Sequence, residues 1–279
     1  MDFLQTDAYL RRIDAERPAA PTTRALHDLH LAHLRAVPFE NLSIHLGEDI
    51  ELTDDALVAK IVDRHRGGFC YELNGAFAAL LTALGFEVTR LQARVYEPSG
   101  RPGIPYDHMA LRVRTSDGGD WLADVGFGTH SHFPLAFGER GDQSDPGGTF
   151  RVEETEGSEE SEGSEESGKT AEGDLDVLRD GKPQYVLERR PRALADFTIG
   201  AWWHRTSPLS HFTRSLVCSL LTETGRITLS GRTLTTTVAG EREIAELATD
   251  ADVLAAYATH FGIMLERVPE VKKPVPKAD

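Results

Sequence analysis

A cysteine at the point where a glycine-containing turn leads into a predicted helix is the first candidate for chemistry. Cys70 lies within the run Arg66-Gly67-Gly68-Phe69-Cys70-Tyr71-Glu72-Leu73-Asn74. Apolar residues recur at helical spacing from Leu73 to Leu84, and Gly85 is a natural C-terminal stop. A thiol in the first turn of a helix lies near unsatisfied amides and the positive end of the helix dipole. We therefore expect a lowered pKa for Cys70 and a role as nucleophile.

Acyl transfer through a cysteine also needs an imidazole to take the thiol proton and a third group to orient the imidazole. Residues 107–114 alternate between apolar and polar, which predicts a half-buried strand that contains His108. Residues 115–119 predict a turn, and residues 120–126 predict the returning strand, which contains Asp124. The pattern therefore predicts a β-hairpin with a histidine on one strand and an aspartate on the other.

The register of this hairpin decides whether the two side chains can meet. If Arg114 pairs with Asp120 across the turn, Ala110 faces Asp124, and His108 lies diagonally from Asp124 on the same face. Diagonal neighbours are about 7–8 Å apart at the backbone, within reach of a carboxylate and an imidazole. A slip of one residue would place the two on opposite faces. The hypothesis of a Cys-His-Asp triad therefore includes a prediction of strand register.

These motifs resemble those of the arylamine N-acetyltransferase family. The run at 66–74 is similar to the family's cysteine motif, and His108 begins a strand as the family's histidine does. The segment Trp121-Leu122-Ala123-Asp124-Val125-Gly126-Phe127-Gly128 resembles the aspartate motif. Two flanking segments agree as well, Val37-Pro38-Phe39-Glu40-Asn41-Leu42 and Thr206-Ser207-Pro208-Leu209-Ser210-His211-Phe212, so the resemblance spans roughly residues 1–260. The departures are Phe69, Tyr71 and Leu73 around the cysteine, and Asp107, where the family usually has a smaller or neutral polar residue.

The resemblance implies an α+β fold: a helical bundle, a β-barrel and an α/β lid around a triad core like that of cysteine proteases. We expect the bundle with the nucleophile at 1–85, the barrel with the histidine and aspartate at 86–190, and the lid at 191–279 with a frayed end beyond Arg267. Start and stop signals predict helices from Thr6 or Asp7 to 13, from Thr22 or Thr23 to 36, at 53–65, at 208–218, and from 250 or 251 to 261. Strands are predicted at 88–96, 149–152 and 184–187, with a further hairpin turning at 230–231.

The implied activity is a two-step transfer of an acetyl group from acetyl-CoA, through an acetyl-cysteine, to an arylamine, hydrazine or arylhydroxylamine, with no metal. By the same resemblance, Phe39, Val95 and Phe127 form the apolar wall around the aromatic ring, although ordinary core packing explains each equally well. Gly103, Gly128, Thr129 and Ser210 are weaker candidates for contacts to coenzyme A. Three alternatives stay open: an ansamycin-type amide synthase, a cysteine-dependent thioester hydrolase and a non-catalytic binding module.

The net charge of −15 is concentrated in one segment. Residues 153–176 hold eleven carboxylates and Lys169, a net of −10, which leaves −5 for the rest of the chain. The sequence Glu-Gly-Ser-Glu-Glu-Ser occurs twice in succession, at 156–161 and 162–167, and offers nothing apolar to bury. We expect a disordered acidic insertion here, with a docking tail for a basic partner as the alternative.

Other partners and cofactors have weaker support. No basic patch exists to neutralise phosphates, so nucleic acid is disfavoured. No apolar run approaches the roughly 20 residues of a membrane span, and residues 1–7 have no secretory pattern. With two cysteines in all, of which Cys218 lies in an apolar run and is expected to be a core residue instead of a disulfide partner, we expect a cytoplasmic protein without disulfides.

Histidines at other places are weak candidates for metal or hydrolase sites. His27, His30 and His33 recur every three residues, but steps of three drift around a helix, so the three side chains do not converge on one ion. His130 and His132 have no cysteine or carboxylate pair at a zinc-ligand spacing nearby. Ser210 and His211 are adjacent and diverge by about 100° on a helix, so they do not form a hydrolase pair.

Overall fold

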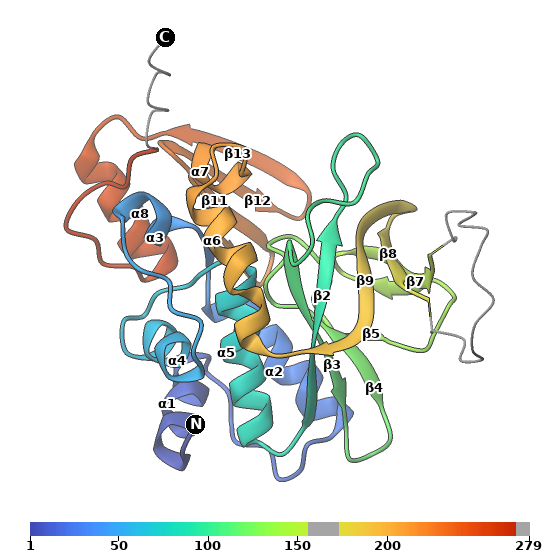
Figure 1. Ribbon diagram of the computed structural model, residues 1–279. Coiled ribbons are helices and arrows are strands. Elements are labelled where there is room, and N and C mark those ends of the chain that lie inside the picture. Colours follow the sequence, from blue (N-terminus) through green and yellow to red (C-terminus); the bar gives the residue numbers. More distant parts are fainter. Residues whose placement is uncertain (156–172, 272–279) are drawn as a thin grey trace.

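Helix α5 (Cys70–Ala83) has no exposed polar face, and this explains its central position. Twelve of its fourteen residues are buried, as expected of a helix without a polar face. Figure 1 shows α5 with α1 and α4 on one side and the strands β2 and β3 on the other. The computed structural model describes residues 1–155 and 173–271. The helices are α1 (Phe3–Arg12), α2 (Thr23–Ala36), α3 (Leu42–Leu46), α4 (Asp54–Val62), α5, the 3-10 helix η1 (Leu194–Phe197), α6 (Thr198–Thr206), α7 (His211–Arg214) and α8 (Asp250–Phe261).

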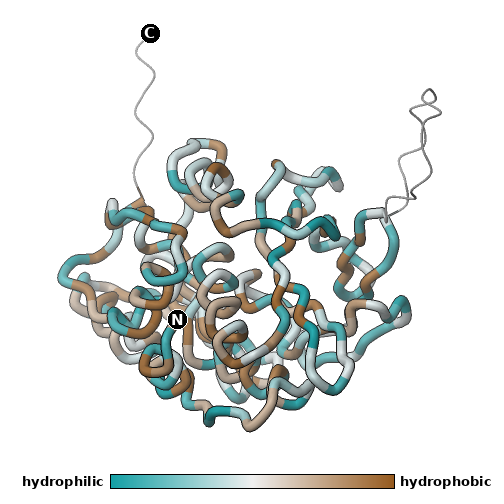
Figure 2. Tube along the Cα trace, turned by 60° about the horizontal axis from the view of Figure 1, so that its bottom comes forward, coloured by the Kyte–Doolittle hydropathy of each residue, from teal (hydrophilic) through white to brown (hydrophobic). Residues whose placement is uncertain are grey.

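The strands form two antiparallel sheets. They are β1 (Phe39–Glu40), β2 (Glu87–Val95), β3 (His108–Arg114), β4 (Asp120–Ala123), β5 (Leu135–Ala136), β6 (Gln143–Asp145), β7 (Gly148–Glu154), β8 (Leu175–Arg179), β9 (Lys182–Arg192), β10 (Cys218–Leu221), β11 (Gly225–Ser230), β12 (Thr233–Val238) and β13 (Glu241–Glu246). The larger sheet has the order β5-β4-β3-β2-β9-β8-β7-β6 and the smaller one β1-β10-β11-β12-β13. Figure 2 shows hydrophobic residues recurring in short stretches along these elements.

The larger sheet is a nearly closed barrel. Its two end strands are joined by a side chain, because the Gln143 amide accepts from the Ala136 backbone at 2.7 Å and donates back to it at 3.1 Å. The interior is filled by a cluster of buried residues that includes Leu91, Leu122 and Phe150. Joining the two edges in this way protects their backbone groups from pairing with another chain.

The smaller sheet connects distant parts of the sequence. Strand β1, from the helical part of the chain, pairs with β10 through Phe39 opposite Ser219. Helix α8 packs on this sheet, and Cys218 is fully buried in the hydrophobic core between them, which we call the α8 core. The prediction that Cys218 is a core residue is therefore confirmed, and both cysteines are free.

Several predicted elements are confirmed in position. Helix α2 begins after the N-cap Thr22 and ends at Ala36, and α8 ends before Gly262, which has a φ of +66°. Helix α4 starts after the N-cap Thr53 as expected, but it ends at Val62 instead of His65. The turn at 230–231 lies between β11 and β12 as predicted.

Other predicted boundaries are wrong. The first helix is capped by Asp2, whose side chain accepts from Gln5 N, and not by Thr6 or Asp7. The helix expected at 208–218 is short, because α7 ends at Arg214 and the apolar run around Cys218 forms β10. Elements α3, β5, β6, β8 and α6 were not expected from the sequence.

The acidic insertion is shorter at both ends than the predicted 153–176. Strand β7 extends to Glu154, β8 begins at Leu175, and Thr155 N donates to Asp174 O at 2.9 Å. Residues 156–172 lie outside the described residues, and so does the tail at 272–279. The chain beyond Arg267 is expected to fray, but Val268 still packs against the α8 core.

Candidate active site

Cys70 is the first residue of α5, at the place predicted for a nucleophile. Its side chain is 3% exposed, and Glu72 accepts a hydrogen bond from Phe69 N at 3.3 Å, which closes the first turn. The preceding glycines are needed for space and not for a positive φ. A Cβ on Gly67 would lie 1.8 Å from Pro38 O, and one on Gly68 would lie 2.6 Å from Glu72 Cβ.

The predicted hairpin register is confirmed. Arg114 pairs with Asp120, and Leu111 pairs with Ala123. The pairing ends at Ala123, and the next residue is Asp124, whose Oδ2 lies 2.7 Å from His108 Nε2. Both side chains are buried, with 3% and 1% of their surface exposed.

Asp124 is held by more than the histidine. Its Oδ1 accepts from Asn74 Nδ2 at 2.8 Å and from Gly126 N at 3.0 Å. Its backbone N–H donates to His30 Nε2 at 3.2 Å. His30 Nδ1 lies 2.9 Å from the carbonyl of His132, so this ring is the neutral tautomer with its proton on Nδ1.

The electrostatics of the pair follow from these contacts. Burial disfavours charge on both groups, but the Asp124 carboxylate and its hydrogen bond raise the pKa of His108 to about 10. Burial also disfavours the charged form of Asp124. The charge of His108 and the hydrogen bonds from His108 and Asn74 outweigh this effect and hold the pKa of Asp124 well below its usual range. At neutral pH the pair is therefore an imidazolium and a carboxylate.

The thiol completes this chain of contacts. Cys70 makes a hydrogen bond with the His108 side chain, and since Nε2 faces Asp124, Nδ1 is the nitrogen available to the sulfur. Burial raises the pKa of Cys70, and the nearby His108 opposes this rise without cancelling it. The expected lowering of the thiol pKa by the helix terminus alone is therefore wrong, because desolvation of the buried sulfur outweighs it.

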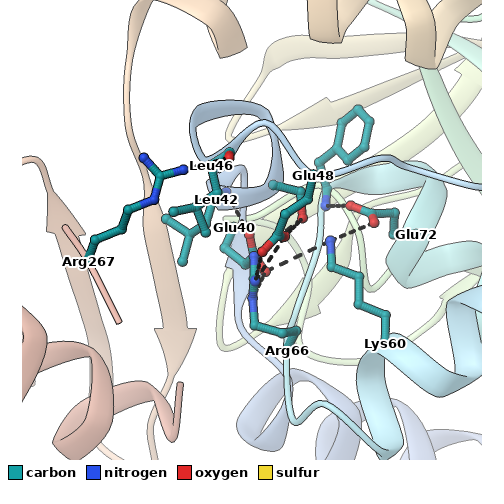
Figure 3. A network of polar contacts seen from close by, with 10 residues as sticks. Glu40, Leu42, Leu46, Glu48, Lys60, Arg66, Glu72 and Arg267 are labelled. Atoms are coloured by element: carbon teal, nitrogen blue, oxygen red, sulfur yellow. Dashed lines mark hydrogen bonds and ion pairs between the residues drawn. The ribbon is translucent and has the colours of Figure 1, made fainter. Parts of the chain in front are cut away.

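A buried ionic network holds the turn that precedes Cys70 (Figure 3). Lys60 Nζ lies 2.6 Å from Glu72 Oε1 and 4.0 Å from Glu40 Oε1. Arg66 Nε lies 2.9 Å from Glu40 Oε1, and its Nη1 lies 3.1 Å from Glu48 Oε2. Because Glu72 also caps the Phe69 amide, the network joins α4, β1 and the first turn of α5.

Asp107, the unusual neighbour of His108, connects the barrel to α6. Its Oδ1 lies 3.0 Å from His204 Nε2, and its Oδ2 accepts from Val95 N at 3.1 Å. His204 Nδ1 is 3.2 Å from the Ser210 hydroxyl. The Asp107 carbonyl also lies 4.0 Å from Cys70 Sγ, so the contact between Asp107 and α6 lies close to the reacting atom.

The residues expected to form the apolar wall lie around the same region. Phe127 packs edge-on against the His108 ring with a centroid distance of 5.2 Å. Phe39 lies over Gly128, where a Cβ would be 3.5 Å from its ring. Val95 is half-buried against the barrel core together with Phe127. Their roles toward a substrate stay predictions.

The four residues expected to contact coenzyme A differ in their exposure and in their hydrogen bonds. Gly103 N donates to Val95 O at 2.8 Å, and Gly128 has a φ of +90°. Thr129 is exposed and its carbonyl accepts from Arg179 Nη1 at 3.3 Å. Ser210 is 1% exposed and its hydroxyl is bonded to His204 and to Phe212 N, which leaves it little freedom to contact a ligand.

The histidines considered as metal ligands have other partners. His27 packs against Trp121, His30 orients Asp124, and His33 Nε2 lies 3.0 Å from the Tyr9 hydroxyl. His130 is buried between Phe127 and Tyr185. Within residues 1–155 and 173–271, no group of three or more His, Cys, Asp or Glu side chains could hold a metal ion.

Three residues of the site were missed from the sequence. Asn74 and Glu72 lie one turn or less after Cys70 inside the quoted motif, and polar residues on a buried helix were the available signal. His204 gave no such signal, because its partner Asp107 lies 97 residues earlier. Only the fold brings these two together.

Comparisons with known proteins identify the family of the chain. A family model described as N-acetyltransferase matches residues 22–270. The arylamine N-acetyltransferase of Mycolicibacterium smegmatis is 34% identical over 263 residues, which cover 92% of this chain and 91% of that protein. The structure of the arylamine N-acetyltransferase from Salmonella typhimurium superposes with a TM-score of 0.81 at 28% identity, covering 96% and 94% of the two chains. The structure of the Mycobacterium marinum enzyme in complex with CoA gives 0.77 at 30% identity over 92% of each chain. The chain therefore belongs to the arylamine N-acetyltransferase family and is an acyltransferase.

Proposed function

We propose that this chain transfers an acetyl group from acetyl-CoA to an arylamine, hydrazine or arylhydroxylamine by a ping-pong reaction through acetyl-Cys70. The observation that carries the proposal is the buried chain from Cys70 through His108 to Asp124 at the start of α5. A nucleophile, a base in contact with it and a group that orients the base are the parts that acyl transfer requires. The names of the relatives support the arylamine as acceptor, and the M. marinum complex supports coenzyme A as the carrier.

In the first step, the Cys70 sulfur attacks the thioester carbonyl as a thiolate, with the positive charge of His108 beside it. Coenzyme A leaves after it takes a proton from His108. In the second step, the amine attacks the acetyl-cysteine and gives its proton to His108, and the thiolate is restored. Asp124 holds the ring and stabilises its positive charge throughout.

The oxyanion of each tetrahedral intermediate needs hydrogen-bond donors. Glu72 N and Leu73 N both donate to Phe69 O, and the first N–H groups of a helix have no partner within it. The amides of Cys70 and Tyr71 are therefore the candidates to stabilise the oxyanion.

Around this core we propose the three-part organisation expected from the sequence: a helical bundle (1–85), a barrel (86–190) and an α/β lid (191–279). The separate cores of the barrel and of the α8 region support this division. Phe39, Val95 and Phe127 would contact the aromatic ring, and Gly103, Gly128, Thr129 and, less favourably, Ser210 would lie along the coenzyme A path.

We propose a cytoplasmic location, since a reducing compartment keeps a nucleophilic thiol free. No helix among the described residues is long and apolar enough to cross a bilayer. A small-molecule acceptor together with coenzyme A accounts for the site without a nucleic acid or a metal.

The test is intact-protein mass spectrometry after treatment with acetyl-CoA in the absence of an amine. We expect one acetyl group on Cys70 and none on the Cys70→Ala variant, and addition of an arylamine should remove the acetyl group. Consumption of acetyl-CoA without an acceptor would instead indicate a thioester hydrolase. Failure to react with acetyl-CoA, together with ring closure of a carrier-bound chain, would indicate an amide synthase.

A further inference from the structure

Asp107 places a carboxylate at the border of the proposed active site, one residue before His108. Its carbonyl lies 4.0 Å from Cys70 Sγ, and its side chain is 14% exposed. The negative charge of this side chain acts on the thiol, because it is one of the causes that raise the pKa of Cys70. A charge that acts on the sulfur also acts on any molecule that approaches the sulfur.

Two contacts from different elements fix this carboxylate in place. Its Oδ2 accepts from Val95 N at 3.1 Å, and its Oδ1 lies 3.0 Å from His204 Nε2. The His204 ring is held in turn by the Ser210 hydroxyl, 3.2 Å from Nδ1. A charged group supported in this way keeps its position when a ligand binds.

The charge of Asp107 has little to offset it. Within residues 1–155 and 173–271, its ionic contact is with His204, and no lysine or arginine forms an ion pair with it. If the Ser210 hydroxyl donates to Nδ1, Nε2 donates to Asp107 and the ring is neutral. A neutral ring leaves the negative charge uncancelled, unlike the charge of Asp120, which Arg112 contacts at 2.6 Å.

Aromatic and apolar side chains surround the carboxylate. The His204 ring packs edge-on against Phe212 with a centroid distance of 5.1 Å, and Phe212 continues to Phe39 at 6.1 Å. On the other side, Val95 packs with Phe127 against the barrel core. Since Phe39, Val95 and Phe127 are the residues proposed to contact the acceptor's ring, the carboxylate connects two parts of this wall. Charges interact more strongly in such surroundings than in water, because the effective dielectric constant is lower.

We propose that Asp107 makes the acceptor site selective for charge, so that neutral and cationic arylamines react well and arylamines that carry a carboxylate react poorly. This inference rests on the proposed function, because it takes an arylamine as the acceptor of the acetyl group. An anionic acceptor brings a second negative charge close to a carboxylate that no lysine or arginine neutralises. A cationic acceptor is attracted by the same charge. Unfavourable contacts with the wrong ligand are a general means of specificity.

The experiment uses three arylamines of similar shape and different charge: 3-aminobenzoate, 3-aminobenzamide and 3-amino-N,N,N-trimethylanilinium. Cys70 is first acetylated with acetyl-CoA at neutral pH. The second-order rate constant for loss of the acetyl group to each arylamine is then measured by intact-protein mass spectrometry. Relative to the neutral amide, we expect Asp107→Asn to raise the rate with 3-aminobenzoate on the order of tenfold and to lower the rate with the cation by several-fold. Added salt should narrow the differences between the acceptors in the wild type.

The neutral acceptor separates charge from position, because a displaced His108 or an altered thiol changes all three rates together. Asp107→Ser is a second neutral variant and should show the same opposite changes. His204→Gln keeps the charge of Asp107 and can still donate a hydrogen bond to it, so it should keep the wild-type preference. Asp117→Asn removes an exposed carboxylate at the turn between β3 and β4 and is the control for a general change in charge.

Equal changes with all three acceptors would overturn the inference, and so would unchanged rates in both Asp107 variants. In either case acetylation of Cys70 by acetyl-CoA and its transfer to an arylamine would still be observed, and the proposed function would stand. If acetyl-CoA does not acetylate the wild type, the proposed function fails and this inference fails with it.

Discussion

At the scale of single residues, the carboxylate of Asp124 is the most constrained group of the site. It accepts hydrogen bonds from His108, Asn74 and Gly126, and its backbone is held by His30. A carboxylate with several donors is strongly stabilised in its charged form. The consequence for His108 is a fixed ring orientation and a positive charge at neutral pH.

We predict that Asp124→Asn lowers the rate of Cys70 acetylation by roughly 10³- to 10⁴-fold, as loss of the orienting carboxylate does in other triads. The amide can keep some of the hydrogen bonds but cannot stabilise the imidazolium. The measurement is a single-turnover reaction with acetyl-CoA. Asp120→Asn, at the start of the strand β4 that precedes Asp124 and half-exposed beside Arg112, is the matched control and should react nearly as the wild type does. Similar rates for both variants would contradict a role for Asp124.

At the scale of elements, the close contact between the loop after β4 and the start of α5 brings the triad residues together. A Cβ on Gly126 would lie 2.7 Å from Asn74 Nδ2, 2.8 Å from Cys70 Cα and 2.9 Å from Cys70 O. None of these atoms is the free end of a flexible chain. Any side chain at 126 must therefore move the aspartate loop away from the helix.

We predict that Gly126→Ala reduces acetylation of Cys70 by at least about 10²-fold, because displacements on the order of 1 Å have such effects on reacting groups. Thermal unfolding should show a lower Tm as well. Gly138→Ala is the control, since a Cβ there meets nothing within 4 Å. Wild-type acetylation in Gly126→Ala would show that this contact does not position the thiol.

The buried network around Lys60 supports the same turn from the other side. Removing one partner of a buried ion pair leaves the other charge unpaired, which costs about 3–5 kcal/mol, whereas removing both partners is much less destabilising. We predict this pattern for Lys60→Met, Glu72→Gln and the double variant, measured as free energies of unfolding in urea. The exposed pair Arg24–Asp28, with side chains 86% and 60% exposed, should show changes of at most about 0.5 kcal/mol. Additive losses at Lys60 and Glu72 would contradict a direct coupling.

The elements also show what the sequence alone could predict. The hairpin register followed from alternation and turn length, since a slip would have exposed apolar residues such as Leu111 and Val113. The caps Thr22 and Thr53 were identified because local hydrogen bonding decides them. The apolar run at Cys218 was assigned to a helix, and it forms a strand because Glu40 of β1 provides a partner 178 residues earlier in the chain. Short apolar runs do not distinguish the two states without this tertiary information.

At the scale of the whole molecule, the contact between Asp107 of the barrel and His204 of α6 could not be predicted. Asp107 was recognised as unusual, but its partner His204 belongs to a helix that the sequence did not indicate. Cys70, His108 and Asp124 could be proposed because each lies in a short motif that is readable from its sequence neighbours.

The position of Asp107 leads to a prediction about the ionisation of the Cys70 thiol. Burial raises the pKa of Cys70, and His108 lowers it. The negative charge of Asp107 is a further cause that raises it. Removal of that charge in Asp107→Asn should lower the thiol pKa and leave the backbone contacts in place, since an amide can still accept from Val95 N.

We therefore expect the pH profile of Cys70 alkylation by iodoacetamide to shift to lower pH by several tenths of a unit to about one unit. At a pH below the thiol pKa, the variant should react faster than the wild type, because only the thiolate is alkylated. Asp117→Asn, which removes an exposed carboxylate at the distant hairpin turn, is the control and should leave the profile unchanged. The weakened contact with His204 Nε2 should also lower Tm, which separates the two roles of Asp107. A shift to higher pH would mean that Asp107 acts on the thiol through the position of α6 and not through its charge.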